Sequence, residues 1–212
     1  MITVKGFTFN PLQENTYLLF NDQGFCVIID PGCYSSTERR ELQDFINEYK
    51  PEHKYLLNTH CHLDHVFGNK FIHETFDTPL HIHEKEKPVL AYAPISGKSW
   101  NVPFDNYEGE LVFLKEGEEI RLGTDILKVL FTPGHSPGHI CFYCEAQKFV
   151  IGGDVLFRGS IGRTDLPGGD HETLLRSIRQ ELFSLPDDVI VYPGHGEPTT
   201  IGFEKKHNPF FR

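Results

Sequence analysis

Short apolar runs separated by turn-forming residues occupy the start of the chain, a pattern typical of β-strands. They predict three strands, over residues 3–9, 16–20 and 25–30. Between Ser35 and Pro51 the apolar residues instead recur every three or four positions, which predicts a helix with one buried face. Glu38 follows Ser35 at the spacing of a capping box, so we expect the helix to begin at Ser35 or Ser36.

Strands and helices alternate over the rest of the chain, as in an α/β fold. Further strands are expected over residues 55–57, 79–83, 120–122, 126–131, 140–143, 149–151 and 189–192. Further helices are expected over residues 66–76, 84–93 and 171–183. Residues 94–109 are rich in Pro, Gly and Asn and are expected to form an irregular loop. Because no low-complexity linker interrupts the pattern, residues 1–212 are predicted to form a single domain.

Composition and charge indicate which kinds of molecule the protein is expected to bind. The chain is 39% hydrophobic and 24% charged, which is ordinary for a soluble globular protein. Its formal net charge of −10 disfavours nucleic acid or an anionic membrane as partner, because both are bound through clustered Lys and Arg. The chain has no apolar run of transmembrane length and no pattern of a secretory signal at its start. We therefore expect a cytoplasmic protein that acts on a small molecule.

The five cysteines are an odd number and make a poor disulfide framework. Cys141 and Cys144 have CxxC spacing, but residues three apart in a strand point to opposite faces, which disfavours a shared metal. Buried, reduced thiols are therefore expected. Cys61 is expected to be a bystander within the segment described next.

The segment from His60 to His65 brings four potential metal ligands into six residues, directly after a predicted strand. In an extended loop the imidazoles of His60 and His62 project to one side and can bind the same ion. Asp64 and His65 lie where the chain turns into a helix and can face a second ion. An unpaired buried Asp beside three imidazoles would be costly, and both residue types bind zinc, iron or manganese. The segment therefore predicts a metal site.

Three further candidate ligands follow predicted strands on loops that contain Pro or Gly. They are His135 in TPGHS, Asp154 in GGD and His195 in PGHG. Loops presented by a rigid sheet commonly carry catalytic residues, and glycine allows the backbone to approach a site closely. Together with the first segment they predict a site for two metal ions. His139 is expected to support the site or to pack, and His81 and His83 are expected at the surface.

These motifs, THxHxDH, TPGHS, GGD and PGHG, in this order and over nearly the whole chain, resemble those of the metallo-β-lactamase superfamily. The most similar branch is that of thioesterases of the hydroxyacylglutathione hydrolase (glyoxalase II-like) type. The resemblance implies an αββα four-layer sandwich of two mixed sheets flanked by helices, with the site at one edge between the sheets. It also implies one metal on His60, His62 and His135, a second on Asp64, His65 and His195, and Asp154 bridging both.

This division of ligands suits hydrolysis. Three neutral imidazoles and an open position make one ion a Lewis acid, and a water between two dications loses a proton near neutral pH. Asp154 would hold both ions, and Asp64 would orient the attacking hydroxide. Zinc is the first expectation, and iron or manganese also suit these ligands. The expected substrate is a small thioester such as S-lactoylglutathione, for which no Ser or Cys nucleophile is needed.

The segment at 162–165, GRTD, resembles one that offers a cation to a substrate carboxylate in glutathione-thioester hydrolases and persulfide dioxygenases. Arg163 is therefore the candidate for binding an anionic end of the substrate. Alternatively, it forms a structural ion pair with Asp165 or Asp170.

The larger hydroxyacylglutathione hydrolases have a C-terminal helical extension that contacts glutathione, whereas sixteen residues follow Gly196 here. Contacts to glutathione would then come from the 94–109 loop or from a neighbouring subunit, and the oligomeric state is open.

Two other functions remain as alternatives. A persulfide dioxygenase shares the fold and would use a single iron, held by residues that match His60, His62 and His135 or Asp154. A metal-binding protein without turnover would keep the ligands but hydrolyse nothing. Antibiotic hydrolysis fits less well because no secretory signal is seen, and RNA cleavage because no basic groove is indicated.

Overall fold

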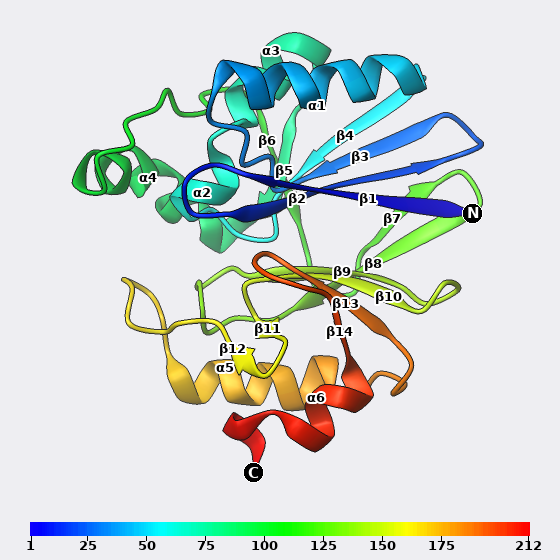
Figure 1. Cartoon of the computed structure of the whole chain (residues 1–212), viewed down its shortest axis with the longest axis vertical. Coiled ribbons are helices and arrows are strands. Elements are labelled where there is room, and N and C mark those ends of the chain that lie inside the picture. The colour runs from blue at the N-terminus through cyan, green and yellow to red at the C-terminus, as the bar shows by residue number, and fades with distance from the viewer. The chain divides into compact units, whose positions relative to one another are not determined.

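Two six-stranded mixed sheets, one in each half of the chain, organise the computed structural model, which describes all 212 residues (Figure 1). Contacts divide the chain into two units, Met1–Phe113 and Leu114–Arg212. The predicted α/β class, with two mixed sheets and several helices, is confirmed. That residues 1–212 form one domain stays a prediction.

The first sheet places the parallel strands β3 and β4 side by side. Its strands are β1 (Ile2–Phe9), β2 (Glu14–Asn21), β3 (Phe25–Ile29), β4 (His53–Leu57), β5 (Leu80–His83) and β6 (Leu111–Leu114), in that order across the sheet. Strands β1 to β3 are antiparallel, whereas β3, β4 and β5 are parallel. Ile29 pairs with Leu57, so the loops that follow β3 and β4 leave the sheet at the same edge. Ligand sites commonly form at such edges.

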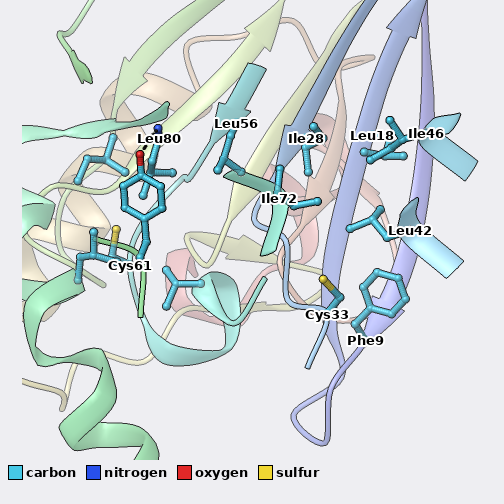
Figure 2. Close-up of a cluster of buried hydrophobic side chains, with 14 of the residues drawn as sticks. Phe9, Leu18, Ile28, Cys33, Leu42, Ile46, Leu56, Cys61, Ile72 and Leu80 are labelled. Atoms are coloured by element: carbon cyan, nitrogen blue, oxygen red, sulfur yellow. Dashed lines mark hydrogen bonds between the residues drawn. The ribbon is translucent and has the colours of Figure 1, made fainter. Parts of the chain in front are cut away.

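Helices of the first unit cover this sheet through an apolar cluster. They are α1 (Ser36–Tyr49), α2 (Leu63–Val66), α3 (Asn69–Phe76) and α4 (Lys87–Ser99), the last preceded by the 3₁₀ turn η1 (Glu84–Glu86). The capping box of Ser35 and Glu38 is present, as predicted. Leu42 and Ile46 of α1 and Ile72 of α3 are buried in one cluster with sheet residues such as Leu18, Ile28 and Leu56 (Figure 2).

Helix α4 corrects one prediction, because it continues through Pro94 to Ser99, where we expected the loop to begin. Proline has no N–H to donate to the carbonyl of the residue four positions earlier, here Leu90. The side chain of Asn106 donates to that carbonyl instead, over 2.8 Å from Nδ2. The lost helical hydrogen bond is thereby replaced from the segment that follows the helix, which has no regular structure before β6.

The predicted helix over 66–76 is divided into α2 and α3 at Gly68. A Cβ atom at Gly68 would lie 2.5 Å from Cys33 Sγ and 2.7 Å from the carbonyl oxygen of Pro31. Only glycine allows this approach of the helix to the loop after β3. Asp64 and His65 therefore lie inside α2, and His62 is the residue that precedes it.

The second sheet has the order β14-β13-β10-β9-β8-β7. Its strands are β7 (Glu119–Leu122), β8 (Asp125–Phe131), β9 (Ile140–Cys144), β10 (Phe149–Gly153), β13 (Ile190–Pro193) and β14 (Thr199–Thr200). A separate hairpin, β11 (Leu156–Phe157) with β12 (Ser160–Ile161), follows β10. Strands β10 and β13 form the parallel pair, so the residues after each leave the sheet at one edge.

Helix α5 (His171–Ser177), continued by a π-helical turn (Ile178–Leu182), and α6 (Ile201–His207) pack on this sheet, and a 3₁₀ turn (Pro209–Phe211) ends the chain. Leu174, Ile178 and Ile201 share an apolar cluster with Val150 and Val191 of the strands. No helix combines the length and apolar character needed to cross a membrane. All five cysteines are buried and none forms a disulfide, as expected.

Candidate metal centre

The first candidate ligand set lies between β4 and α2 and within α2, and it consists of His60, His62, Asp64 and His65. The ring of His60 lies 4.1 Å from that of His65 and 4.8 Å from that of His62, between centroids. His65 Nε2 lies 3.8 Å from Asp64 Oδ2. His60, Asp64 and His65 are buried. Three imidazoles and a carboxylate thus converge within a few ångströms.

Asp30, directly after β3, is the residue that holds this set in place, with a left-handed backbone (φ 50°). Its Oδ1 accepts hydrogen bonds from the Thr59 backbone N–H over 2.7 Å and from Asn58 Nδ2 over 3.1 Å. Its Oδ2 accepts one from Thr59 Oγ1 over 2.6 Å and faces His65 Nδ1 at 3.1 Å. A carboxylate on Nδ1 directs Nε2 of the same ring toward a metal, the usual support of a metal-binding histidine.

Ligand atoms of Asp30, His60 and His65 also lie within 4.8 Å of one another. Because Asp30 already accepts three hydrogen bonds besides its contact with His65, we assign it to supporting this set rather than to binding an ion.

A second buried acidic side chain, Glu14, lies behind the same histidine. Glu14 Oε1 lies 3.9 Å from His65 Nδ1, and Thr16 Oγ1 donates to Oε2 over 2.9 Å. Burial raises the pKa of the Glu14 carboxyl well above its ordinary value; His65 opposes this shift, and the nearby Asp30 and Asp64 add to it. Asp30 and Asp64, the other acidic groups beside these imidazoles, favour a cation at this place.

The loop between His60 and His62 is fixed by Glu86, a buried residue of η1. Glu86 Oε2 accepts a hydrogen bond from the Cys61 backbone N–H over 2.8 Å. Burial, with a smaller contribution from Glu86, raises the pKa of the Cys61 thiol well above its ordinary value. Cys61 is therefore a protonated, packed residue, in agreement with its predicted bystander role.

The second ligand set, His135, Asp154 and His195, is arranged around one carboxylate oxygen. Asp154 Oδ2 lies 3.6 Å from Nε2 of His135 and 3.6 Å from Nε2 of His195. Two ligand atoms that each lie about 2.0–2.2 Å from one ion stand roughly 3.4 Å apart at a tetrahedral angle. Both separations are too long for a hydrogen bond and match ligand atoms that share a metal.

Nδ1 of His135 donates to the carbonyl oxygen of Arg163 over 2.7 Å, which leaves Nε2 directed at Asp154. A Cβ atom at Gly162 would lie 1.9 Å from the carbonyl oxygen of Asp154 and 3.1 Å from His135 Nδ1. Glycine is therefore required where the chain passes between these two ligands.

The TPGHS loop that carries His135 is held by α5. Ser177 Oγ donates to the carbonyl oxygen of Pro133 over 2.7 Å, and the backbone N–H of Asp170 donates to the carbonyl oxygen of Gly134 over 2.7 Å. His139 is buried and its Nε2 accepts a hydrogen bond from the Asp154 backbone N–H over 3.1 Å. His139 thus supports Asp154, as predicted.

Arg163 forms the structural ion pair that was the alternative to substrate binding. Its Nε and one terminal nitrogen each donate to a carboxylate oxygen of Asp165 over 2.7 Å. This pairing holds the pKa of Asp165 down, at about 2. Asp170 instead accepts from the Thr173 backbone N–H and caps α5. The Arg163 side chain remains half exposed.

Both ligand sets fit divalent metal ions by their chemistry, because each consists only of imidazole and carboxylate groups. Other histidines have local roles: His81 Nδ1 lies 3.1 Å from two backbone carbonyl oxygens, and His83 accepts the Lys85 N–H. Sequence reasoning missed Asp30, Glu14 and Glu86. For Asp30, a polar residue directly after a strand and before Pro-Gly was an available signal.

A model of the metallo-beta-lactamase superfamily matches residues 9–195 of the chain. The chain is 40% identical over 201 residues to the probable metallo-hydrolase YqgX of Bacillus subtilis, which covers 94% of this chain and 93% of that protein. It is 41% identical over 200 residues to the hydroxyacylglutathione hydrolase GloC of Haemophilus influenzae, which covers 93% and 92%.

Solved structures resemble the chain over almost its whole length. The crystal structure of the BLEG-1 B3 metallo-beta-lactamase matches with a TM-score of 0.89 and 37% identity, covering 99% of each chain. TTHA1623 in a di-iron-bound form matches with a TM-score of 0.87 and 38% identity, covering 97% of this chain and 99% of that one.

Proposed function

Because this chain belongs to the metallo-beta-lactamase superfamily, we propose that it is a dinuclear metal-dependent hydrolase that cleaves small thioesters, S-lactoylglutathione being the first to test. The observation that carries the proposal is the pair of equal distances from Asp154 Oδ2 to Nε2 of His135 and of His195. One carboxylate oxygen placed between two imidazoles allows the same carboxylate to share an ion with each of them.

The proposed ligands follow the motifs. His60, His62 and His135 would hold one ion and Asp64, His65 and His195 the other, with Asp154 between them. When bound, two such ions polarise a carbonyl and lower the pKa of a water enough to give a nucleophile at neutral pH. Joining the two ligand sets in one centre is part of the proposal.

The chain's own groups prepare this chemistry. The Asp30 carboxylate faces Nδ1 of His65, and the Arg163 carbonyl accepts a hydrogen bond from Nδ1 of His135. These two contacts fix the orientation of both rings before any ion binds. Asp64, buried beside His65, is assigned to orient the nucleophile. Because hydrogen bonds of the protein hold His65, His135 and Asp154, little reorganisation of these residues accompanies the reaction.

The thioester class is supported by the Haemophilus relative named hydroxyacylglutathione hydrolase GloC, at 41% identity. Arg163 is assigned to the anionic end of the substrate, and its half-exposed guanidinium is reachable. Asp165 then competes with the substrate or orients the guanidinium. Arg163→Ala should raise KM for a carboxylate-bearing thioester with little change in kcat, whereas an unchanged KM would reject this role.

Metal identity is proposed as zinc, with iron or manganese as alternatives. A relative at 38% identity is known in a di-iron-bound form, so iron is a realistic occupant of such ligands. A persulfide dioxygenase would need a single iron and would consume oxygen. Measured metal content together with oxygen uptake therefore separates the two functions.

The test is hydrolysis of S-D-lactoylglutathione by protein of known metal content, followed as loss of the thioester. His135→Ala should abolish turnover and lower metal content. His171→Ala is the matched control, because His171 is exposed and belongs to neither ligand set. Loss of turnover in His135→Ala alone supports the proposal. A dimetallic parent that cleaves neither this nor any other thioester would overturn it.

A further inference from the structure

The β11–β12 hairpin adjoins the second ligand set. It begins two residues after Asp154, and the ring of Phe157 lies edge-on to that of His195, with centroids 6.3 Å apart. The chain that leaves β12 reaches Arg163, whose carbonyl accepts the hydrogen bond of His135 Nδ1. Any displacement of this hairpin therefore displaces the surroundings of each ligand.

Helix α6, which lies in the same unit, holds the tip of this hairpin. Glu204 Oε2 accepts a hydrogen bond from the Gly159 backbone N–H over 3.0 Å. Asn208 Nδ2 donates to the carbonyl of Ser160 over 3.0 Å. Consecutive hairpin residues are thus bound by two side chains one helical turn apart.

A third contact joins the same elements. The guanidinium carbon of Arg158 lies 4.7 Å from the centroid of the Phe203 ring, in the range of a cation–π interaction. Arg158, Gly159 and Ser160 therefore all contact α6 or the residue that ends it.

Glu204 is the centre of these contacts and is fully buried. Its Oε1 accepts a hydrogen bond from Thr199 Oγ1 over 2.5 Å, and its Oε2 accepts a second one, from Asn208 Nδ2 over 2.8 Å. No ion pair involving Glu204 accompanies these bonds. A buried carboxylate is costly unless donors satisfy it, and here neutral donors from a strand, a hairpin and a helix end do so.

We propose that Glu204 is a positioning residue of the metal centre, which acts on His135, Asp154 and His195 through the β11–β12 hairpin. This inference rests on the proposed function, since it requires the second ligand set to bind metal. It gives the last residues of the chain a role in the site that is independent of any contact with glutathione.

Glu204→Gln is the direct test. One carboxylate oxygen becomes an NH₂ group. Turned toward Gly159 and Asn208 it faces two donors, and turned toward Thr199, whose hydroxyl can rotate to accept, it leaves those two donors a neutral oxygen, which is a weaker acceptor than a carboxylate. The hairpin tip is then held less firmly, and the affinity for zinc should fall by about tenfold, the scale of other changes to groups that support metal ligands. Arg158→Ala keeps the Glu204 carboxylate and removes only the exposed partner of the Phe203 ring. It should also lower the affinity for zinc, by about two- to fivefold.

Lys205→Gln is the matched control on the same helix. Lys205 Nζ donates to Asp187 Oδ1 over 2.7 Å and makes no contact with the hairpin. Zinc affinity is measured by competition with a chelator, and thermal unfolding of each metal-free variant is recorded beside it. Lys205→Gln should lower the melting temperature but leave zinc affinity within about twofold of the parent.

The outcomes distinguish failure of the Glu204 positioning role from failure of the proposed metal site. If His135→Ala weakens zinc binding while Glu204→Gln and Arg158→Ala do not, or if Lys205→Gln weakens it equally, the positioning role is wrong and the proposed site stands. If His135→Ala binds zinc as the parent does, the proposed metal site itself is wrong. Should Glu204→Gln fail to fold, Arg158→Ala alone decides.

Discussion

His135 Nδ1 donates to the carbonyl oxygen of Arg163 over 2.7 Å, so a predicted metal ligand is oriented by the backbone of the predicted substrate-binding residue. The two positions are far apart in sequence but joined by one hydrogen bond. A change in the backbone at 162–163 therefore acts on the metal site as well as on the substrate end.

Gly162→Ala is predicted to break the hydrogen bond between His135 Nδ1 and the Arg163 carbonyl oxygen. The added Cβ would lie 1.9 Å from the Asp154 carbonyl oxygen, which forces the backbone apart. We expect a loss of metal content and at least a tenfold loss of thioesterase activity. Gly6→Ala is the control, because its Cβ meets only the Tyr17 ring at 3.4 Å. Normal metal content in Gly162→Ala would show that this close approach is not needed.

Asp30→Asn is predicted to weaken metal binding without changing the backbone, because Asn also accepts the left-handed conformation. The new NH₂ group replaces either Oδ1, which accepts from the Thr59 N–H and Asn58 Nδ2, or Oδ2, which accepts from Thr59 Oγ1 and faces His65 Nδ1. Affinity measured by chelator competition should fall by about 10- to 100-fold. Asp77→Asn, at another left-handed position that ends α3, should bind as the parent does. Equal affinities of the two variants would contradict the role of Asp30.

Pro94 and Asn106 are predicted to be coupled in stability. Asn106→Ala leaves the Leu90 carbonyl without its donor, which should cost about 1–3 kcal/mol. In the background of Pro94→Ala the restored N–H can bond that carbonyl, so the same substitution should cost less. Denaturant unfolding of the two single variants and the double variant measures this. Additive costs would show that Asn106 does not replace the missing bond.

Sequence reasoning could name the candidate metal ligands because they lie in short motifs that follow strands. It could not foresee the helical end of α4, since the donor that permits Pro94 inside a helix comes from Asn106, beyond the helix. The β11–β12 hairpin was missed because strands of two residues carry no hydrophobic period, and α6 was missed because its 7 residues span only about two helical turns. Nothing in the sequence distinguishes Glu204 from a surface glutamate, because one of the three donors to its carboxylate, the Gly159 N–H, is distant along the chain.

Buried thiols are predicted to reduce stability at high pH. Burial raises the pKa of Cys26 and of Cys33 from 9.0 to about 12. Between these values the unfolded chain has lost the thiol protons that the folded chain keeps, so the free energy of unfolding falls as pH rises through this range. Urea unfolding of the metal-free protein at increasing pH should show the decline, and Cys26→Ala/Cys33→Ala should flatten it. An equally steep decline in the double variant would assign it to other groups.

The central claim, a dinuclear centre built from both ligand sets, is tested most directly by anomalous scattering from crystals of the metal-loaded protein. The account predicts two ions about 3.5–4 Å apart, with Asp154 bound to both and the histidines divided as proposed. A single ion on His60, His62 and His135, or two ions without Asp154 between them, would contradict it.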